Sequence, residues 1–296
     1  MAAATGDENP APSENHLAGP NFFLHIRRGW HTVCCQLYDT EYLNPQTNMK
    51  LSKTLLCGLV AVGSTLLTYG EDVTGTVAVG YNSIYEFRGV DLGSNMVEAS
   101  ASIATTYNGF GFSATAWYAT VNDNANNPTP NELDLTLGIT KSLGPVNLSG
   151  GYIYYNFFGA NSANTQELYL GASMEIIAGI SASATAYRDV DLFDGTYVDF
   201  NLSKTFKPCS AVDIVTVVGM GLADDSGWQL KANGRTLDGY QQFYAMVTVP
   251  WTIRKGVTLA PYLRYVNADG ALMSEVPGAA TGGDHIIGGI KLTCTF

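Results

Sequence analysis

The chain has 296 residues, of which 14% are charged, with a formal net charge of −11 and a mean hydropathy of +0.05. Soluble domains carry roughly 25% charged residues, so the low charge and near-zero hydropathy indicate a protein that meets both lipid and water. The acidic balance argues against nucleic acid as a partner, because a protein that binds a run of phosphates needs a surplus of basic side chains.

The first 70 residues differ from the rest and predict two segments that precede the folded domain. Residues 1–48 hold three of the four histidines and show no strand-like alternation, and we interpret them as an extra N-terminal segment from a misplaced start. Residues 49–70 have the pattern of a signal peptide, because Lys50 and Lys53 precede an apolar run of about fifteen residues. This run is shorter than the roughly 20 residues of a transmembrane helix. We therefore expect residues 71–296 to form the exported domain.

From Val73 onward, apolar and polar residues alternate in segments of about the length that a tilted strand needs to cross a bilayer. The predicted strands cover residues 73–89, 96–107, 110–121, 132–142, 146–158, 167–177, 180–188, 196–206, 212–222, 240–250, 256–266 and 285–296. Their connections alternate between short turns and longer loops, and the longer loops include residues 122–131, 159–166, 223–239 and 267–284. Outer-membrane barrels show this alternation of loop length. The sequence thus predicts an all-β fold, a transmembrane antiparallel up-and-down β-barrel of about 12 strands.

One face of the predicted strands is apolar, as a lipid-facing surface requires, and Leu133, Leu135 and Leu137 share such a face. Pro261 falls inside a strand, where its missing N–H removes a ladder hydrogen bond, so we expect a bulge or a weakened pairing there. Cys209 and Cys294 should both be unpaired, because they lie far apart around the predicted barrel. Aromatic residues near strand ends are expected to form interfacial girdles, namely Tyr85, Phe87, Tyr118, Tyr154, Trp251 and Tyr265.

The last predicted strand places Ile286, Ile290, Leu292 and Phe296 on one face and ends at the aromatic residue. This arrangement resembles the terminal signature by which bacterial outer-membrane barrels are recognised for assembly. It implies that the barrel-assembly machinery is a partner, and that outer-membrane lipid and lipopolysaccharide surround the barrel. Taken alone, the same alternation also fits an edge strand of a soluble sheet.

Stretches rich in Gly, Tyr and acidic residues recur along the exported domain. They are S-I-Y-E-F-R-G-V from Ser83, Y-N-G-F-G-F-S-A-T-A-W-Y-A-T-V-N-D from Tyr107, E-L-D-L-T-L-G-I from Glu132, and G-Y-I-Y-Y-N-F-F-G from Gly151, followed by Q-E-L-Y-L-G. Over nearly all of this domain the chain resembles the TorF family of porins. The resemblance implies an outer-membrane barrel that passes small solutes, with no fixed substrate and no catalytic signature.

Acidic residues and arginines recur on the inward faces of the predicted strands. We predict that they line the pore as a charged constriction in the outer half of the lumen, and the residues are Glu86, Arg88, Glu98, Glu132, Asp134, Glu167, Asp199 and Arg264. A ring of carboxylates raises the local concentration of cations and repels anions. Alternatively, the acids pair with Arg88, Arg264 and Lys291 in a hydrogen-bonded lumen that holds the barrel rigid and passes little.

Metal, cofactor and enzymatic functions find little support in the sequence. Residues 189–195 resemble a calcium loop in part, but Phe193 takes a ligand position, which favours a solvated acidic loop. The exported domain has a single histidine, His285, and lacks nucleophile-elbow, metal-ligand and phosphate-loop motifs. An outer-membrane phospholipase carries its Ser and His on the lipid-facing side, whereas His285 is expected to point inward. We therefore expect no catalytic residue, no metal and no cofactor.

The predicted function is that of an outer-membrane porin-like channel for passive diffusion of small hydrophilic solutes, with a preference for cations. The alternative is a non-conducting structural or adhesive barrel that acts through its external loops. The two differ in whether the purified protein conducts ions across a bilayer.

Overall fold

The computed structural model describes residues 73–121, 131–158, 164–231, 236–268, 272–273 and 283–296. The predicted extra segment, the signal peptide and the start of the exported domain lie outside these residues. The strands are β1 (Val73–Phe87), β2 (Val90–Tyr107), β3 (Phe110–Val121), β4 (Asn131–Leu143), β5 (Val146–Phe158), β6 (Thr165–Ile177), β7 (Ile180–Asp189), β8 (Thr196–Phe206), β9 (Ile214–Lys231), β10 (Thr236–Thr248), β11 (Trp251–Arg254), β12 (Val257–Ala268), β13 (Leu272–Met273) and β14 (Asp284–Thr295). Across these ranges, no helix is long and apolar enough to span a membrane.

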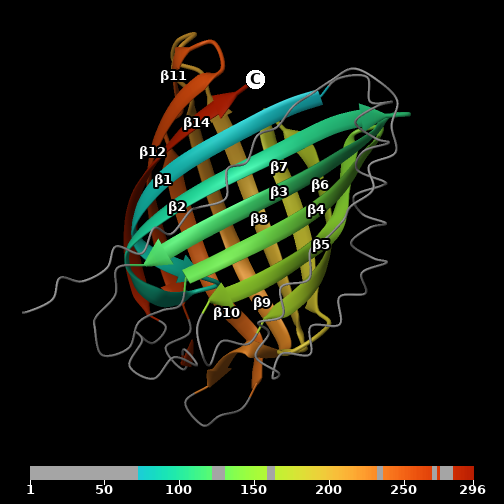
Figure 1. Cartoon of the computed structure of the whole chain (residues 1–296), viewed down its shortest axis with the longest axis vertical. Helices are drawn as coiled ribbons and strands as arrows, with labels where there is room; N and C mark the ends of the chain where they lie inside the picture. The colour runs from blue at the N-terminus through green and yellow to red at the C-terminus, as the bar shows by residue number, and fades with distance from the viewer. Residues whose placement is uncertain (1–72, 122–130, 159–163, 232–235, 269–271, 274–282) are drawn as a thin grey trace, which may run out of the picture. The chain divides into compact units, whose positions relative to one another are not determined.

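The strands form one antiparallel sheet that closes on itself (Figure 1). Strands β1 to β10 pair in chain order, β10 pairs with β12, β12 with β14, and β14 with β1. The short β11 pairs with β12, and β13 pairs with the end of β9. The fourteen strands less these two short ones leave twelve that make up the wall. The predicted closed antiparallel barrel of about 12 strands is confirmed.

The outer face of the barrel is apolar, as the alternation predicts. Exposed side chains on it include Leu135, Leu168 and Leu170, whereas Glu132 and Glu167 on the same strands are buried on the inner face. On β14, Ile286, Ile290 and Leu292 are likewise exposed. The two-residue period of a strand thus sorts these side chains between the two faces.

The first and last strands pair without interruption along the seam. Seven residue pairs join β1 to β14, from Thr76 opposite Thr295 to Asn82 opposite Gly289. Beyond them, Gly75 and Phe296 exchange two backbone hydrogen bonds, at 2.8 and 2.9 Å. Since this pairing leaves neither strand with a free edge, the barrel meets the requirement that a sheet in hydrocarbon satisfy its own backbone groups.

The structure shows that three of the predicted connections are wrong. The turn between the first two strands is Arg88–Gly89 and β2 begins at Val90, so residues 90–95 are strand and not loop. The predicted loop at 223–239 is mostly strand, because β9 runs to Lys231 and β10 begins at Thr236. Register shifts between these two strands interrupt the alternation that marks a strand in the sequence. The predicted short connection at 251–255 is largely β11.

Pro261 weakens pairing on one side of its strand, as expected. The ladder between β12 and β14 continues through Pro261 without a shift. On the opposite side, the β10 ladder ends at Thr248 and resumes only at Trp251. One hydrogen bond bridges the gap, from the Val249 N–H to the Pro261 carbonyl at 2.9 Å. The missing proline N–H accounts for this interruption.

The two cysteines that the structure describes are free, as predicted. Cys209 lies exposed after β8, and Cys294 is half-buried on β14. Neither has a disulfide partner among the residues that the structure describes.

Candidate functional site

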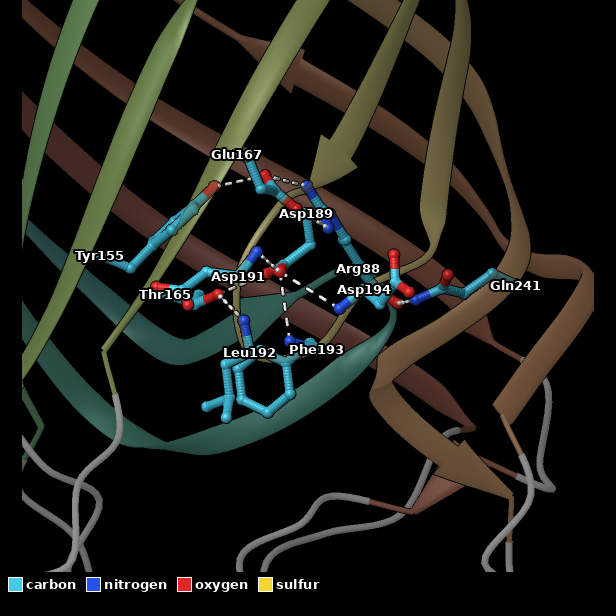
Figure 2. Close-up of polar contacts among 10 residues, drawn as sticks. All are labelled: Arg88, Tyr155, Thr165, Glu167, Asp189, Asp191, Leu192, Phe193, Asp194 and Gln241. Atoms are coloured by element: carbon cyan, nitrogen blue, oxygen red, sulfur yellow. Dashed lines mark hydrogen bonds and ion pairs between the residues drawn. The ribbon is translucent and has the colours of Figure 1, made fainter.

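The tip of the β1–β2 hairpin, residues 84–94, folds away from the wall and crosses the lumen; its ribbon runs beneath the labelled residues in Figure 2. On one side, Val90 is 0% exposed and packs in a core with Ala223, Val266 and Ile287 of β9, β12 and β14. On the other side, Tyr85 packs with Met96, Ala119 and Trp117. We call residues 84–94 the hairpin tip.

The sequence of the turn suits this position. Arg88 and Gly89 both adopt left-handed backbone angles, with φ of 51° and 91°, which two-residue hairpin turns require. Gly89 also lies against the β10 and β12 wall, where an added Cβ would meet Ala268 and Gln242. Only glycine fits both the angle and the close approach at this position.

A buried ion pair fixes the hairpin tip to the far wall. Arg88 Nη1 and Nη2 contact Glu167 Oε1 and Oε2 at 2.7 and 2.8 Å, and these side chains are 7% and 1% exposed (Figure 2). Tyr155 donates to Glu167 Oε2 at 2.8 Å, and Gln241 Nε2 donates to the Arg88 carbonyl at 2.7 Å. The guanidinium also lies 4.4 Å from the ring centroid of Tyr197. The bidentate pair therefore joins the tip to β6 in a position where leaving either charge alone would be costly.

A second polar contact holds the base of the hairpin tip. The Tyr85 hydroxyl donates to Glu132 Oε2, and Glu132 is buried. The Tyr85 ring lies 6.1 Å from the Trp117 ring, centroid to centroid. Tyr85 and Phe87 were predicted to lie in an aromatic girdle, and this is wrong, because the hairpin turns both into the lumen. Tyr118, Trp251 and Tyr265 are exposed on the outer face.

A cavity of about 400 Å³ lies on the β1, β2, β12 and β14 side of the lumen. Two ion pairs line it, Arg264 Nη1 with Glu86 Oε2 at 2.9 Å and Lys291 Nζ with Glu98 Oε1 at 2.8 Å. The remaining lining residues are Asn82, Ile84, Tyr85, Met96, Trp117, Met246, Thr248, Ala260, Tyr262 and Ile287. The cavity thus combines aromatic surface with two acids and two bases, which allows it to hold water and small polar solutes.

The eight residues predicted to form the constriction do not form one ring in the structure, and several of them make ion pairs instead. Arg88 meets Glu167, and Arg264 meets Glu86, whereas Glu98 pairs with Lys291, which was not among the eight. Asp199 accepts hydrogen bonds from the Tyr244 hydroxyl at 3.0 and 3.1 Å. For Asp134 Oδ1, no hydrogen-bond partner occurs among the described residues. The three base–acid pairs match the alternative pairing scheme, and the constriction itself stays a prediction.

Inward tyrosines lie over glycines of the neighbouring strand, a feature that sequence reasoning missed. Tyr169 pairs across the sheet with Gly151, Tyr244 with Gly219, and Tyr262 with Gly289, and a Cβ at any of these glycines would overlap the tyrosine ring. The rings therefore occupy the space that a side chain on the partner strand would need. The signal in the sequence is a Gly opposite a Tyr, which only a correct strand register reveals.

The acidic loop at 189–195 is organised by a buried aspartate, so the expectation of a wholly solvated loop is wrong for Asp189. This side chain is 1% exposed, and its Oδ1 accepts backbone N–H bonds from Asp191, Phe193 and Asp194 at 3.0 to 3.2 Å (Figure 2). Its Oδ2 accepts from Thr165 Oγ1 at 2.7 Å. The described part of the chain holds no group of three His, Cys, Asp or Glu placed for a metal ion.

His285 lies inward on β14 opposite Val266, as predicted. Its Nε2 is buried, and within the described ranges it has no hydrogen-bond partner. Through this nitrogen, His285 makes no hydrogen bond to a serine of the described ranges.

Comparisons with known proteins give one family match. A family model described as "Bacterial protein of unknown function (Gcw_chp)" matches residues 68–233. No curated protein sequence matches the chain. The resemblance to the TorF family is not confirmed by this match and stays a prediction.

Solved structures that are similar to the chain include several outer-membrane barrels. The NanC porin shares 12% identity over 74% of this chain and 98% of its own, with a TM-score of 0.46. An outer membrane channel from Pseudomonas putida F1 shares 11% over 77% and 98%, with a TM-score of 0.49. The translocator domain of the autotransporter NalP from Neisseria meningitidis shares 13% over 82% and 95%, with a TM-score of 0.48.

Proposed function

This chain belongs to the Gcw_chp family of bacterial proteins of unknown function, and we propose that it is an outer-membrane channel through which small hydrophilic solutes diffuse passively. The observation that carries the proposal is a closed sheet with an apolar outer face and a polar cavity inside it. A soluble protein would not expose so many large apolar side chains over adjacent strands. The proposal assigns the protein no catalytic role and no cofactor.

The outer face supports a location in the bacterial outer membrane, where lipid and lipopolysaccharide would surround the barrel. Phe296 is exposed at the end of the closing strand, in the position expected for a signal to the barrel-assembly machinery. Deleting Phe296 should lower the amount of folded, heat-modifiable protein in outer-membrane fractions. Phe206→Ser, which changes another exposed aromatic residue at a strand end, serves as the control. Equal amounts for both variants would contradict this role.

The hairpin tip supports a narrow path. It contacts both sides of the barrel, so it reduces the free cross-section of the lumen at its level. Purified protein in planar bilayers should therefore show discrete conductance steps smaller than those of a barrel of this size with an empty lumen. An absence of steps would overturn the channel and favour the structural or adhesive alternative, which the dense contacts of the hairpin tip also fit.

We also propose that the channel passes cations better than anions. The eight predicted residues and Lys291 comprise six acids and three bases, so the lumen has an acidic excess when all are ionised. Glu132, Asp134 and Asp199 form no ion pair with a base among the described residues. Glu132 and Asp134 are two residues apart on the same face and disfavour each other's charge, so Asp199→Asn is the cleaner test. It should move the reversal potential in a salt gradient toward that of a non-selective pore. An unchanged reversal potential would refute the cation preference.

A further inference from the structure

Lys291, Gly80 and Glu98 form one row across three adjacent strands. Lys291 of β14 is the register partner of Gly80 of β1, and Gly80 is in turn the partner of Glu98 of β2. Because Gly80 has no side chain, Lys291 Nζ reaches Glu98 Oε1 at 2.8 Å over the intervening strand. A Cβ at Gly80 would lie 2.6 Å from Glu98 Oε1, so a side chain at this position would displace the carboxylate from where it lies now.

The two partners differ in how far they are available to a solute. Glu98 is 9% exposed, and its second oxygen accepts a hydrogen bond from Trp117 Nε1 at 2.5 Å, so the carboxylate is held on both sides. Lys291 is 41% exposed. Arg264 repeats the pattern in the same cavity, since it is 25% exposed and its partner Glu86 is 2% exposed. The two bases that line the cavity are therefore more exposed than the carboxylates that compensate them.

We propose that solutes cross the barrel through this cavity and that Lys291 is a specificity-determining residue, which balances Glu98 and limits the cation preference of the path. The inference rests on the proposed channel function. A charge in a narrow, low-dielectric path has a strong effect on the local concentration of ions of each sign. The path therefore suits small neutral and zwitterionic solutes better than a path lined by free carboxylates does.

A charge cycle at this pair tests the proposal through reversal potentials in a salt gradient. Lys291→Met leaves Glu98 uncompensated and should raise the cation-to-anion permeability ratio severalfold. Glu98→Gln leaves Lys291 uncompensated and should lower the ratio below that of the unmodified protein. The double variant, which has no uncompensated charge, should return close to the parental ratio. Lys204→Met is the matched control, because Lys204 lies on the outer-facing side of β8, over the Phe206 ring, and its loss should leave the ratio unchanged.

The outcomes separate this inference from the channel itself. If the unmodified protein and the variants conduct but Lys291→Met and Glu98→Gln leave the ratio unmoved, solutes pass elsewhere and the role of Lys291 is refuted, while the channel stands. If no protein conducts in symmetric salt, both proposals fail. Since a single variant leaves one charge unpaired and can misfold, a second double variant, Lys291→Glu with Glu98→Gln, places one net negative charge opposite a hydrogen-bonding amide. It should raise the cation-to-anion ratio as Lys291→Met does, and an unmoved ratio in a conducting barrel refutes the role of Lys291.

Discussion

At the scale of single residues, the glycines opposite tyrosines give the most direct prediction about stability. Gly289→Ala would place a methyl group against the Tyr262 ring and Asn82, whereas the adjacent Gly288 has open space around its Cβ position. Overpacking of this kind costs about 1 to 3 kcal/mol. Gly289→Ala should lower the free energy of unfolding by that amount in urea titrations in lipid vesicles, and Gly288→Ala should not. Equal effects would contradict the close packing of Tyr262.

The Arg88–Glu167 pair gives a second prediction at this scale. Arg88→Met leaves a buried carboxylate without its partner, which typically costs about 3 to 5 kcal/mol. The free energy of unfolding in urea should fall by about that amount. The double variant Arg88→Met with Glu167→Gln removes both charges and should be less destabilised than the single one. Additive losses from the two single substitutions would show that the pair is not coupled.

The sequence predicted which residues turn inward but not which of them meet. The period of two places Glu98, Glu132 and Glu167 on the inner face, and the structure buries all three. Partner choice depends on register and on the hairpin tip. Lys291 reaches Glu98 only because Gly80 lies between them, and Arg88 reaches Glu167 only because the tip crosses the lumen. Neither relation is local in the sequence.

At the scale of elements, the hairpin tip is the feature that alternation could not predict. A strand that bends inward keeps its two-residue period, but both of its faces then lie inside the barrel. The sequence therefore predicts Tyr85 and Phe87 to be girdle residues, although they pack within the lumen. The composition of the tip offered one hint, because Arg88–Gly89 is a tight turn where the neighbouring outer connections are long.

Asp189 should hold the loop between β7 and β8 in its conformation. Its carboxylate accepts three backbone N–H bonds of the loop, and hydrogen bonds to charged groups contribute about 1.5 to 3 kcal/mol each. Asp189→Ala should open the loop and speed chymotrypsin cleavage near Leu192 and Phe193. Asp191→Ala, at an exposed position in the same loop, should have little effect. Similar cleavage rates for both variants would contradict a capping role for Asp189.

At the scale of the whole molecule, closure was predictable because it depends on strand count and on the alternation of the terminal strands. The β1–β14 seam follows from two strands that are apolar on the outer face and end near Gly75 and Phe296. The extended β9 and β10 were missed because three register shifts hide their period. The interior depends on packing between strands that are far apart in sequence, so the sequence left open whether the lumen conducts.

The central claim is that solutes pass through the lumen and that the hairpin tip, rather than the external loops, limits the bore. Because Asn82 is the register partner of Met96, residues 84–94 can be replaced by Asn-Gly, which leaves Ser83 and Asn95 to flank a two-residue turn. The measurement is single-channel conductance of this variant and of the unmodified protein in the same planar bilayer. The account predicts steps in both proteins and distinctly larger steps in the variant. Steps of equal size, or no conductance from either protein, would contradict it.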